Sequence, residues 1–194
     1  MNYSQRELKD LGIAWLALGL AFALLLSPIR ATRLDVVVSN EFLGLFALSL
    51  VTAGVAFLGH ELAHKAVAVH YGQHAEFRAD YGMLLLAVAG GMAGFLFAAP
   101  GAVHHAGRIT KREGGLIALA GPVANLAMAA VFYALSVVVP IAYYGVLLNL
   151  LLAGFNMLPF GPLDGNTVRD WSLEVYVAVA APSILLALWA LGFI

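Results

Sequence analysis

Long apolar blocks separated by short polar segments run along the whole chain of 194 residues. Helices of about 20 apolar residues cross a bilayer, and the blocks near that length cover residues 11–29, 42–69, 116–139, 141–160 and 173–194. Ser4 and Glu7 have the spacing of a capping box, which predicts a helix start just before the first block. The pattern predicts an all-α polytopic membrane protein with about five transmembrane helices.

Composition supports this fold class and excludes others. Hydrophobic residues make up 62% of the chain and charged residues 11%, against roughly 45–50% and roughly 25% in soluble domains. This excludes a soluble globule and implies contact with the lipid bilayer. The net charge of −1 gives no basic field for a nucleic acid partner. Because the chain has no cysteine, thiolate catalysis and thiolate metal sites are also excluded.

The second block contains the sequence His-Glu-Leu-Ala-His at residues 60–64. Four residues of α-helix turn through about 400° and rise about 6 Å, so both imidazoles share one face. That spacing lets His60 and His64 converge on one zinc ion and places Glu61 to take a proton from water. Each ionisable residue inside a membrane helix costs roughly 2.5–3.5 kcal/mol unless it finds a partner, which argues against a chance cluster.

A catalytic zinc site usually has three protein ligands and one open position, so a third ligand is needed. Asp164 is the leading candidate, because two prolines and two glycines interrupt the helix across residues 156–165. Irregular backbone at membrane depth is tolerated only where it is buried in protein or lines a wet cavity. Taken alone, however, Asp164 is better explained by an ordinary interfacial turn.

Three separated motifs together resemble the site-2 protease family of intramembrane zinc metalloproteases. They are His-Glu-Leu-Ala-His at 60–64, Gly-Pro-Val-Ala-Asn at 121–125, and the pattern Asn-x-x-Pro-x-x-Pro-Leu-Asp-Gly at 156–165. The resemblance covers residues 53–166 and predicts one metalloprotease domain over residues 1–194, with its core in residues 42–166. Ala63 departs from the family pattern, in which glycine is common.

The resemblance also implies a role for each matched residue. His60, His64 and Asp164 would bind one zinc ion per chain, and Glu61 would be the general base. Asn156 would help to hold the tetrahedral intermediate. The implied role of Asn125 is packing beside the active site.

The membrane topology follows from the need to bring these residues to one depth. They meet only if residues 83–99 enter and leave the membrane on the same side. This predicts a re-entrant or membrane-embedded β-like hairpin between the second and third spans, which the glycines there permit. Eight of the ten Lys and Arg residues then share the side of the active site, while Arg30 and Arg33 lie opposite. The positive-inside rule places the N-terminus and the site mouth in the cytosol, in the cell membrane.

These features predict a protease that cleaves in or near transmembrane segments of membrane proteins, as in regulated intramembrane proteolysis. A substrate helix must unwind first, and its freed backbone groups need new partners in lipid. The family resemblance implies membrane-associated strands within residues 83–103, and one of these would supply the partners by β-augmentation. The alternatives are a membrane metal-ion transporter and a catalytically inactive homologue that binds membrane segments. The transporter is disfavoured because Glu61 is intact beside one compact site and the sequence has no second intramembrane cluster of ionisable residues. The inactive homologue is disfavoured because every expected catalytic residue is present. The sequence carries no signal for an oligomeric state.

Overall fold

The computed structural model describes residues 1–27, 39–95 and 100–193. The chain divides into two compact units. One comprises Met1 with residues 59–75 and 105–194, and the other comprises residues 2–58 and 76–104. Arg30 and Arg33, which were predicted to lie opposite the side of the active site, are outside the described residues.

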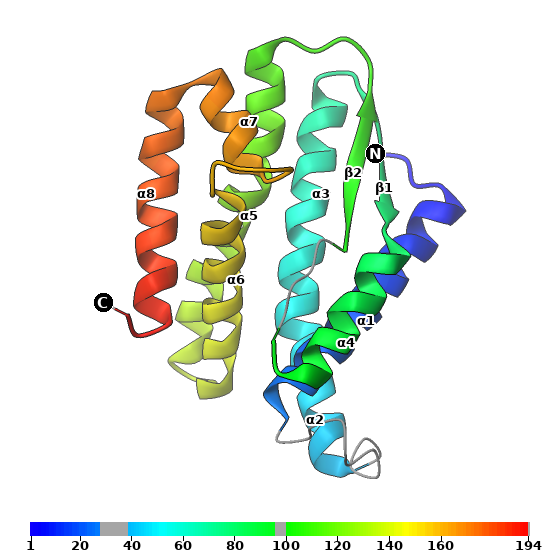
Figure 1. Ribbon diagram of the computed structural model, residues 1–194, viewed down its shortest axis with the longest axis vertical. Helices are drawn as coiled ribbons and strands as arrows, with labels where there is room; N and C mark the ends of the chain where they lie inside the picture. The colour runs from blue at the N-terminus through cyan, green and yellow to red at the C-terminus, as the bar shows by residue number, and fades with distance from the viewer. Residues whose placement is uncertain (28–38, 96–99, 194) are drawn as a thin grey trace. The chain divides into compact units, whose positions relative to one another are not determined.

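The described chain is mostly helical, as predicted, with one small sheet (Figure 1). In chain order the elements are α1 (Gln5–Leu26), α2 (Asn40–Ser49), the π-helical turn η2 (Leu50–Gly54), α3 (Val55–His70), β1 (His74–Ala79), α4 (Tyr81–Ala93), β2 (Gly101–Ala106), α5 (Lys111–Ser136), the 3₁₀ turn η3 (Pro140–Ala142), α6 (Tyr143–Asn156), α7 (Asp164–Trp171) and α8 (Leu173–Ala190).

Four helical stretches within the described residues are long and apolar enough to cross a membrane. They are α1, the continuous run Asn40–His70, α5 and α8. The predicted span over residues 141–160 folds as η3 and the 14-residue helix α6. At 1.5 Å per residue, α6 is about 21 Å long, which is shorter than the hydrocarbon core of a bilayer. The structure therefore shows four long apolar helices where the sequence predicted five spans.

A two-stranded hairpin does lie between the second and third long helices, but residues 83–99, predicted as a re-entrant or β-like hairpin, contain a helix between its strands. The described part of this segment is largely α4, which starts where Asp80 Oδ1 accepts a hydrogen bond from the Met83 amide at 3.0 Å and ends at Gly94 with φ of +86°. The strands β1 and β2 flank this helix and form a two-stranded antiparallel sheet. The Asp80 amide donates to the Pro100 carbonyl at 3.0 Å, so the segment does return to the point that it left.

The start of α1 is tied to β1 by two buried carboxylates. Ser4 Oγ accepts from the Glu7 amide at 3.1 Å, as predicted for the helix cap. Glu7 Oε1, which the predicted capping box would use at its own helix start, instead accepts from the Phe77 amide at 3.0 Å. One turn later, Asp10 accepts from the Ala79 amide at 3.4 Å. These amides of β1 are therefore already paired with acceptors.

A π-helical turn interrupts the long helix that leads to residues 60–64. The extra residue in a π turn disturbs the regular ladder of hydrogen bonds, and the indole Nε1 of Trp15 on α1 donates to the Leu50 carbonyl at 2.9 Å. Gly54 leaves room for that indole, because a Cβ atom there would overlap the ring. The contact fixes α1 against this turn.

The second half of the chain forms a group of four packed helices. α5 packs against α6 and α7, and α8 packs against α6 and α7, as Figure 1 shows for α5, α6 and α8. Thr110 and Glu113 form a complete capping box at the start of α5. Met157 and Val168, both fully buried, hold the loop after α6 and helix α7 in one apolar cluster with Ala118 and Ala180.

Two glycine substitutions test the packing of α1 against α4. A Cβ atom on Gly91 would lie against the backbone of Ala21, whereas a Cβ on Gly12 would have no atom within 4 Å. We expect Gly91→Ala to lower stability by about 1–3 kcal/mol through overpacking. Gly12→Ala should raise stability by up to about 1 kcal/mol through helix propensity. Thermal unfolding in a mild detergent measures both, and equal effects would contradict the packing described.

Candidate metal centre

Three potential ligands from two helices meet in one small cluster. α3 carries His60 and His64, and Asp164 is the first residue of α7. The two Nε2 atoms lie 2.9 Å apart, and Asp164 Oδ2 lies 3.2 Å from Nε2 of His60 and 3.3 Å from Nε2 of His64. Both histidines are buried. The structure thus brings the three predicted ligands together.

The ring orientation of His64 is fixed from α5. Its Nδ1 lies 2.7 Å from the backbone carbonyl oxygen of Ile117. A carbonyl oxygen only accepts hydrogen bonds, so Nδ1 carries the proton and donates. In the neutral ring, Nε2 then has its electron pair free, and it faces the cluster.

The ring of His60 is oriented by a chain of buried amides. Its Nδ1 lies 2.7 Å from Asn125 Oδ1, and Asn125 Nδ2 donates to Asn149 Oδ1 at 2.9 Å. Asn149 Nδ2 in turn donates to the Gly145 carbonyl at 2.8 Å. Both asparagines are fully buried. The predicted packing residue Asn125 therefore contacts a presumed ligand directly, through a hydrogen bond.

The cluster has the donor set of a cation site. Three atoms with electron pairs face one another, and Asp164 Oδ2 is buried without a hydrogen-bond partner among the described residues. Such a group is unfavourable without a partner, and a cation between the three atoms would satisfy all of them. Two imidazole nitrogens and a carboxylate oxygen are ligands that zinc accepts at catalytic sites. The residues present therefore fit a zinc ion.

Gly121 explains how α5 approaches the two imidazoles so closely. A Cβ atom at this position would overlap the rings of both His60 and His64. Gly121 and Asn125 are four residues apart on α5, so they lie on the same helix face. The Gly-Pro-Val-Ala-Asn motif thus supplies space for the rings and an acceptor for one of them.

The other two predicted site residues lie on the same helices or next to them. Glu61 is buried on α3 beside His60. Asn156 is the last residue of α6, and its Nδ2 donates to the Leu152 carbonyl at 3.0 Å. That contact uses one N–H of the amide, which has two. The catalytic roles of Glu61 and Asn156 stay predictions.

Helix α7 carries more than the third ligand. Arg169 donates to the Pro159 carbonyl at 3.1 Å and to Asn166 Oδ1 at 2.7 Å. The first bond links the Pro-rich loop before Asp164 to the helix that follows it, and the second lies within α7.

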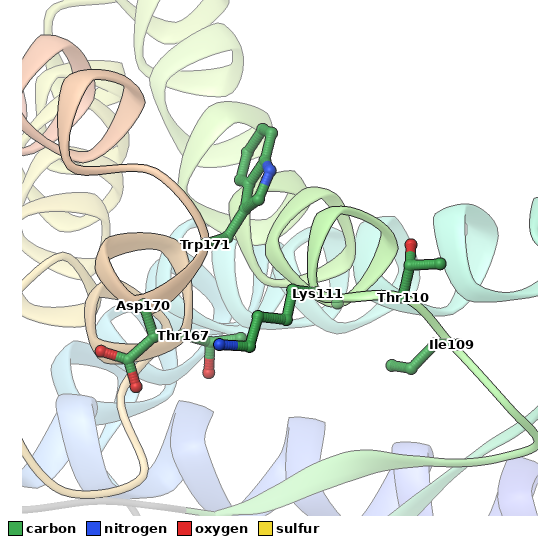
Figure 2. A pocket seen from close by; sticks show the side chains of 7 residues that line it. Ile109, Thr110, Lys111, Thr167, Asp170 and Trp171 are labelled. Atoms are coloured by element: carbon green, nitrogen blue, oxygen red, sulfur yellow. The ribbon is translucent and has the colours of Figure 1, made fainter.

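A cavity of about 550 Å³ lies between α7 and the start of α5 (Figure 2). It is lined by Ile109, Thr110, Lys111, Gly114, Thr167, Asp170 and Trp171. None of the three presumed ligands lines it. Backbone N–H groups at a helix start can bind anions, but here the Glu113 carboxylate of the capping box already accepts from the Thr110 amide. The cavity is therefore distinct from the metal centre, although α7 contributes residues to both.

Two of the functional contacts were not singled out by the sequence. Nothing in the sequence marks the Ile117 carbonyl, because any residue supplies one. Asn149 gives a weak signal, since it is a polar residue within the apolar helix α6. Buried polar side chains in such helices face the protein interior and need a partner.

Comparison with known proteins gives the family. No family model and no solved structure matches the chain. The chain is 38% identical, over 94% of its length and 93% of the relative's, to a protein of Methanocaldococcus jannaschii provisionally named zinc metalloprotease MJ0611. It is 30% identical to zinc metalloprotease MJ0392 of the same organism, over 87% of the chain and 45% of the relative.

A third relative is the Bacillus subtilis protein provisionally named zinc metalloprotease YwhC, with 31% identity over 66% of the chain and 70% of that protein. The names of all three agree with the clustered histidines and aspartate of this structure. With this similarity along almost its whole length, the chain belongs to the site-2 protease family of zinc metalloproteases.

Proposed function

We propose that the protein is an intramembrane zinc metalloprotease that cleaves peptide bonds in or near transmembrane segments of other membrane proteins. The observation that carries this proposal is the convergence of two imidazole nitrogens and a buried carboxylate oxygen, one from each of His60, His64 and Asp164. Four helices of the described residues have membrane-spanning length and composition, and one of them, Asn40–His70, carries His60 and His64. A hydrolytic site built on such helices suits a substrate that is itself in the bilayer.

His60, His64 and Asp164 hold the zinc ion, one per chain. Zinc bound there supplies a Lewis acid that activates water and polarises a peptide carbonyl. Glu61 takes the proton from the attacking water and returns it to the leaving amine. The free N–H of Asn156 donates to the carbonyl oxygen as negative charge develops on it.

The membrane arrangement is part of the proposal. The charge distribution places the N-terminus and the mouth of the site in the cytosol, in the cell membrane. Water reaches the residues of the site from that side, and the transmembrane substrate enters from the bilayer.

The substrate backbone pairs with a strand as it unwinds. Residues 83–93 lie in α4 and offer no strand edge. On β1, the amides of Phe77 and Ala79 already donate to Glu7 and Asp10. We therefore assign the pairing to β2 (Gly101–Ala106), which overlaps the end of the segment predicted from the sequence.

Metal content tests the ligand set. Purified protein should contain about one zinc ion per chain, as one set of three ligands implies. Each of three substitutions should weaken zinc binding: His60→Ala, His64→Ala and Asp164→Ala. The loss should exceed the roughly 10–100-fold loss of affinity that is typical when a residue hydrogen-bonded to a ligand is replaced. The matched control is His70→Ala, which removes an exposed histidine from the same helix. Wild-type zinc content in Asp164→Ala would remove Asp164 from the ligand set.

Cleavage by the Glu61→Gln variant tests the proposed reaction. The amide has nearly the same shape as the carboxylate but cannot take the proton. We expect zinc content and fold to be kept while turnover of a single-span test substrate falls about 10²–10⁴-fold. The assay uses proteoliposomes in which zinc flux is recorded at the same time. Zinc flux without cleavage by the wild type would favour a transporter, and full cleavage by a verified Glu61→Gln protein would refute the mechanism.

Helix unwinding and strand pairing have separate tests. Glycine or proline near the scissile bond of the substrate should speed cleavage, because these residues lower the stability of the substrate helix. Proline placed along Gly101–Ala106 of the enzyme should slow cleavage by removing amide donors, with zinc content unchanged. If folded, zinc-loaded variants across β2 all keep normal rates and substrate choice, this strand does not bind the substrate.

A further inference from the structure

We propose that Asn149 is a positioning residue for the metal centre, which acts through Asn125 to set which nitrogen of His60 carries the proton. Asn149 lies on α6, contacts no presumed ligand in the described hydrogen bonds, and is fully buried. The inference rests on the zinc site of the proposed function. It concerns the residues that prepare this site before any metal binds.

The last hydrogen bond of the series His60–Asn125–Asn149–Gly145 fixes the direction of all the others. The Gly145 carbonyl can only accept, so the Asn149 atom 2.8 Å from it must be the amide nitrogen. Asn149 then turns its oxygen to Asn125, which must donate through Nδ2. Asn125 in turn presents Oδ1 to His60, so Nδ1 of His60 must donate. The proton of the neutral ring is thereby kept off Nε2.

Without Asn149, Asn125 would have a buried N–H₂ group with no acceptor from α6. With that acceptor gone, nothing on α6 fixes the orientation of the Asn125 amide, and rotation turns its N–H₂ group, which is unfavourable to bury against an apolar side chain, toward His60. After that rotation an N–H₂ group would face His60 Nδ1, and Nδ1 would have to accept. The proton would then sit on Nε2, the atom that faces Asp164, and His60 could not act as a ligand through it.

His64 provides an internal control for this mechanism. Its Nδ1 donates to the backbone carbonyl of Ile117 on α5, and this bond does not involve either asparagine. A change at Asn149 that acts through the amide chain should alter the tautomer of His60 and leave that of His64 unchanged. A general loosening of the helices would affect both rings.

The test compares three substitutions on α6. Asn149→Leu keeps four side-chain heavy atoms branched at Cγ and removes both polar atoms. Asn149→Asp keeps the shape, and as the neutral acid it donates its O–H to the Gly145 carbonyl in place of the amide while its other oxygen accepts from Asn125 Nδ2, so it should rescue the orientation. Leu150→Ala is the packing control, because Leu150 is buried beside Val146 and Ala129 rather than beside the asparagines.

Ring ¹⁵N NMR of histidine-labelled, metal-free protein in detergent reports the tautomers, with His60→Ala and His64→Ala used for assignment. We expect the signals of His60 alone to shift toward the Nε2–H form in Asn149→Leu. Zinc affinity, measured by competition with a chelator, should fall about 10–100-fold in that variant. It should stay within a few-fold of wild type in Asn149→Asp and Leu150→Ala.

Unchanged His60 signals and zinc affinity in folded Asn149→Leu would overturn the inference. So would equal shifts of both rings, or an equal loss of affinity in Leu150→Ala. The tautomer is measured without metal and without substrate. If the wild-type protein binds no zinc but His60 alone still shifts in Asn149→Leu, the proposed function fails and the role of Asn149 stands.

Discussion

The structure around the candidate site depends on one constraint: two imidazole nitrogens and a carboxylate oxygen must face one another without a proton between them. Each histidine meets this condition because its other nitrogen donates to an acceptor behind the ring, Asn125 for His60 and the Ile117 carbonyl for His64. In apolar surroundings this arrangement is unfavourable until a cation is bound. The packing of the second half of the chain can therefore be understood as the support that holds the three atoms in place.

Helix α5 supplies that support at regular intervals. Ile117, Gly121 and Asn125 follow at steps of four residues, which places them along one face of the helix. The first offers a carbonyl to His64, the second leaves space for both rings, and the third offers an amide oxygen to His60. His60 and His64 are also four residues apart on α3, so each imidazole lies opposite one of the two acceptors on α5. A side chain at Gly121 would prevent this approach even if every polar contact were kept.

Features set by local spacing could be predicted from the sequence, and features set by distant packing could not. The shared face of His60 and His64 follows from helix geometry, and the cap at Ser4 follows from local hydrogen bonding. Asp164 lies 100 residues after His64, so its place beside the histidines required the family resemblance. Asn149 carried no sign of which partner it would find. The polar residues of β1 gave no strand signal, and the apolar run after Asp80 formed a helix in which Gly91 allows close packing with α1.

Buried carboxylates near the N-terminus serve a different purpose from Asp164. Backbone amides at a strand edge need acceptors, and in a lipid environment each unsatisfied group costs several kcal/mol. Glu7 and Asp10, three residues apart on α1, supply acceptors to alternate amides of β1, which matches the two-residue period of a strand. Neutral side chains of similar size would leave these amides without a charged partner. The two strands of the sheet are therefore not equivalent, because side chains of α1 already accept the hydrogen bonds that β1 would donate to an added strand.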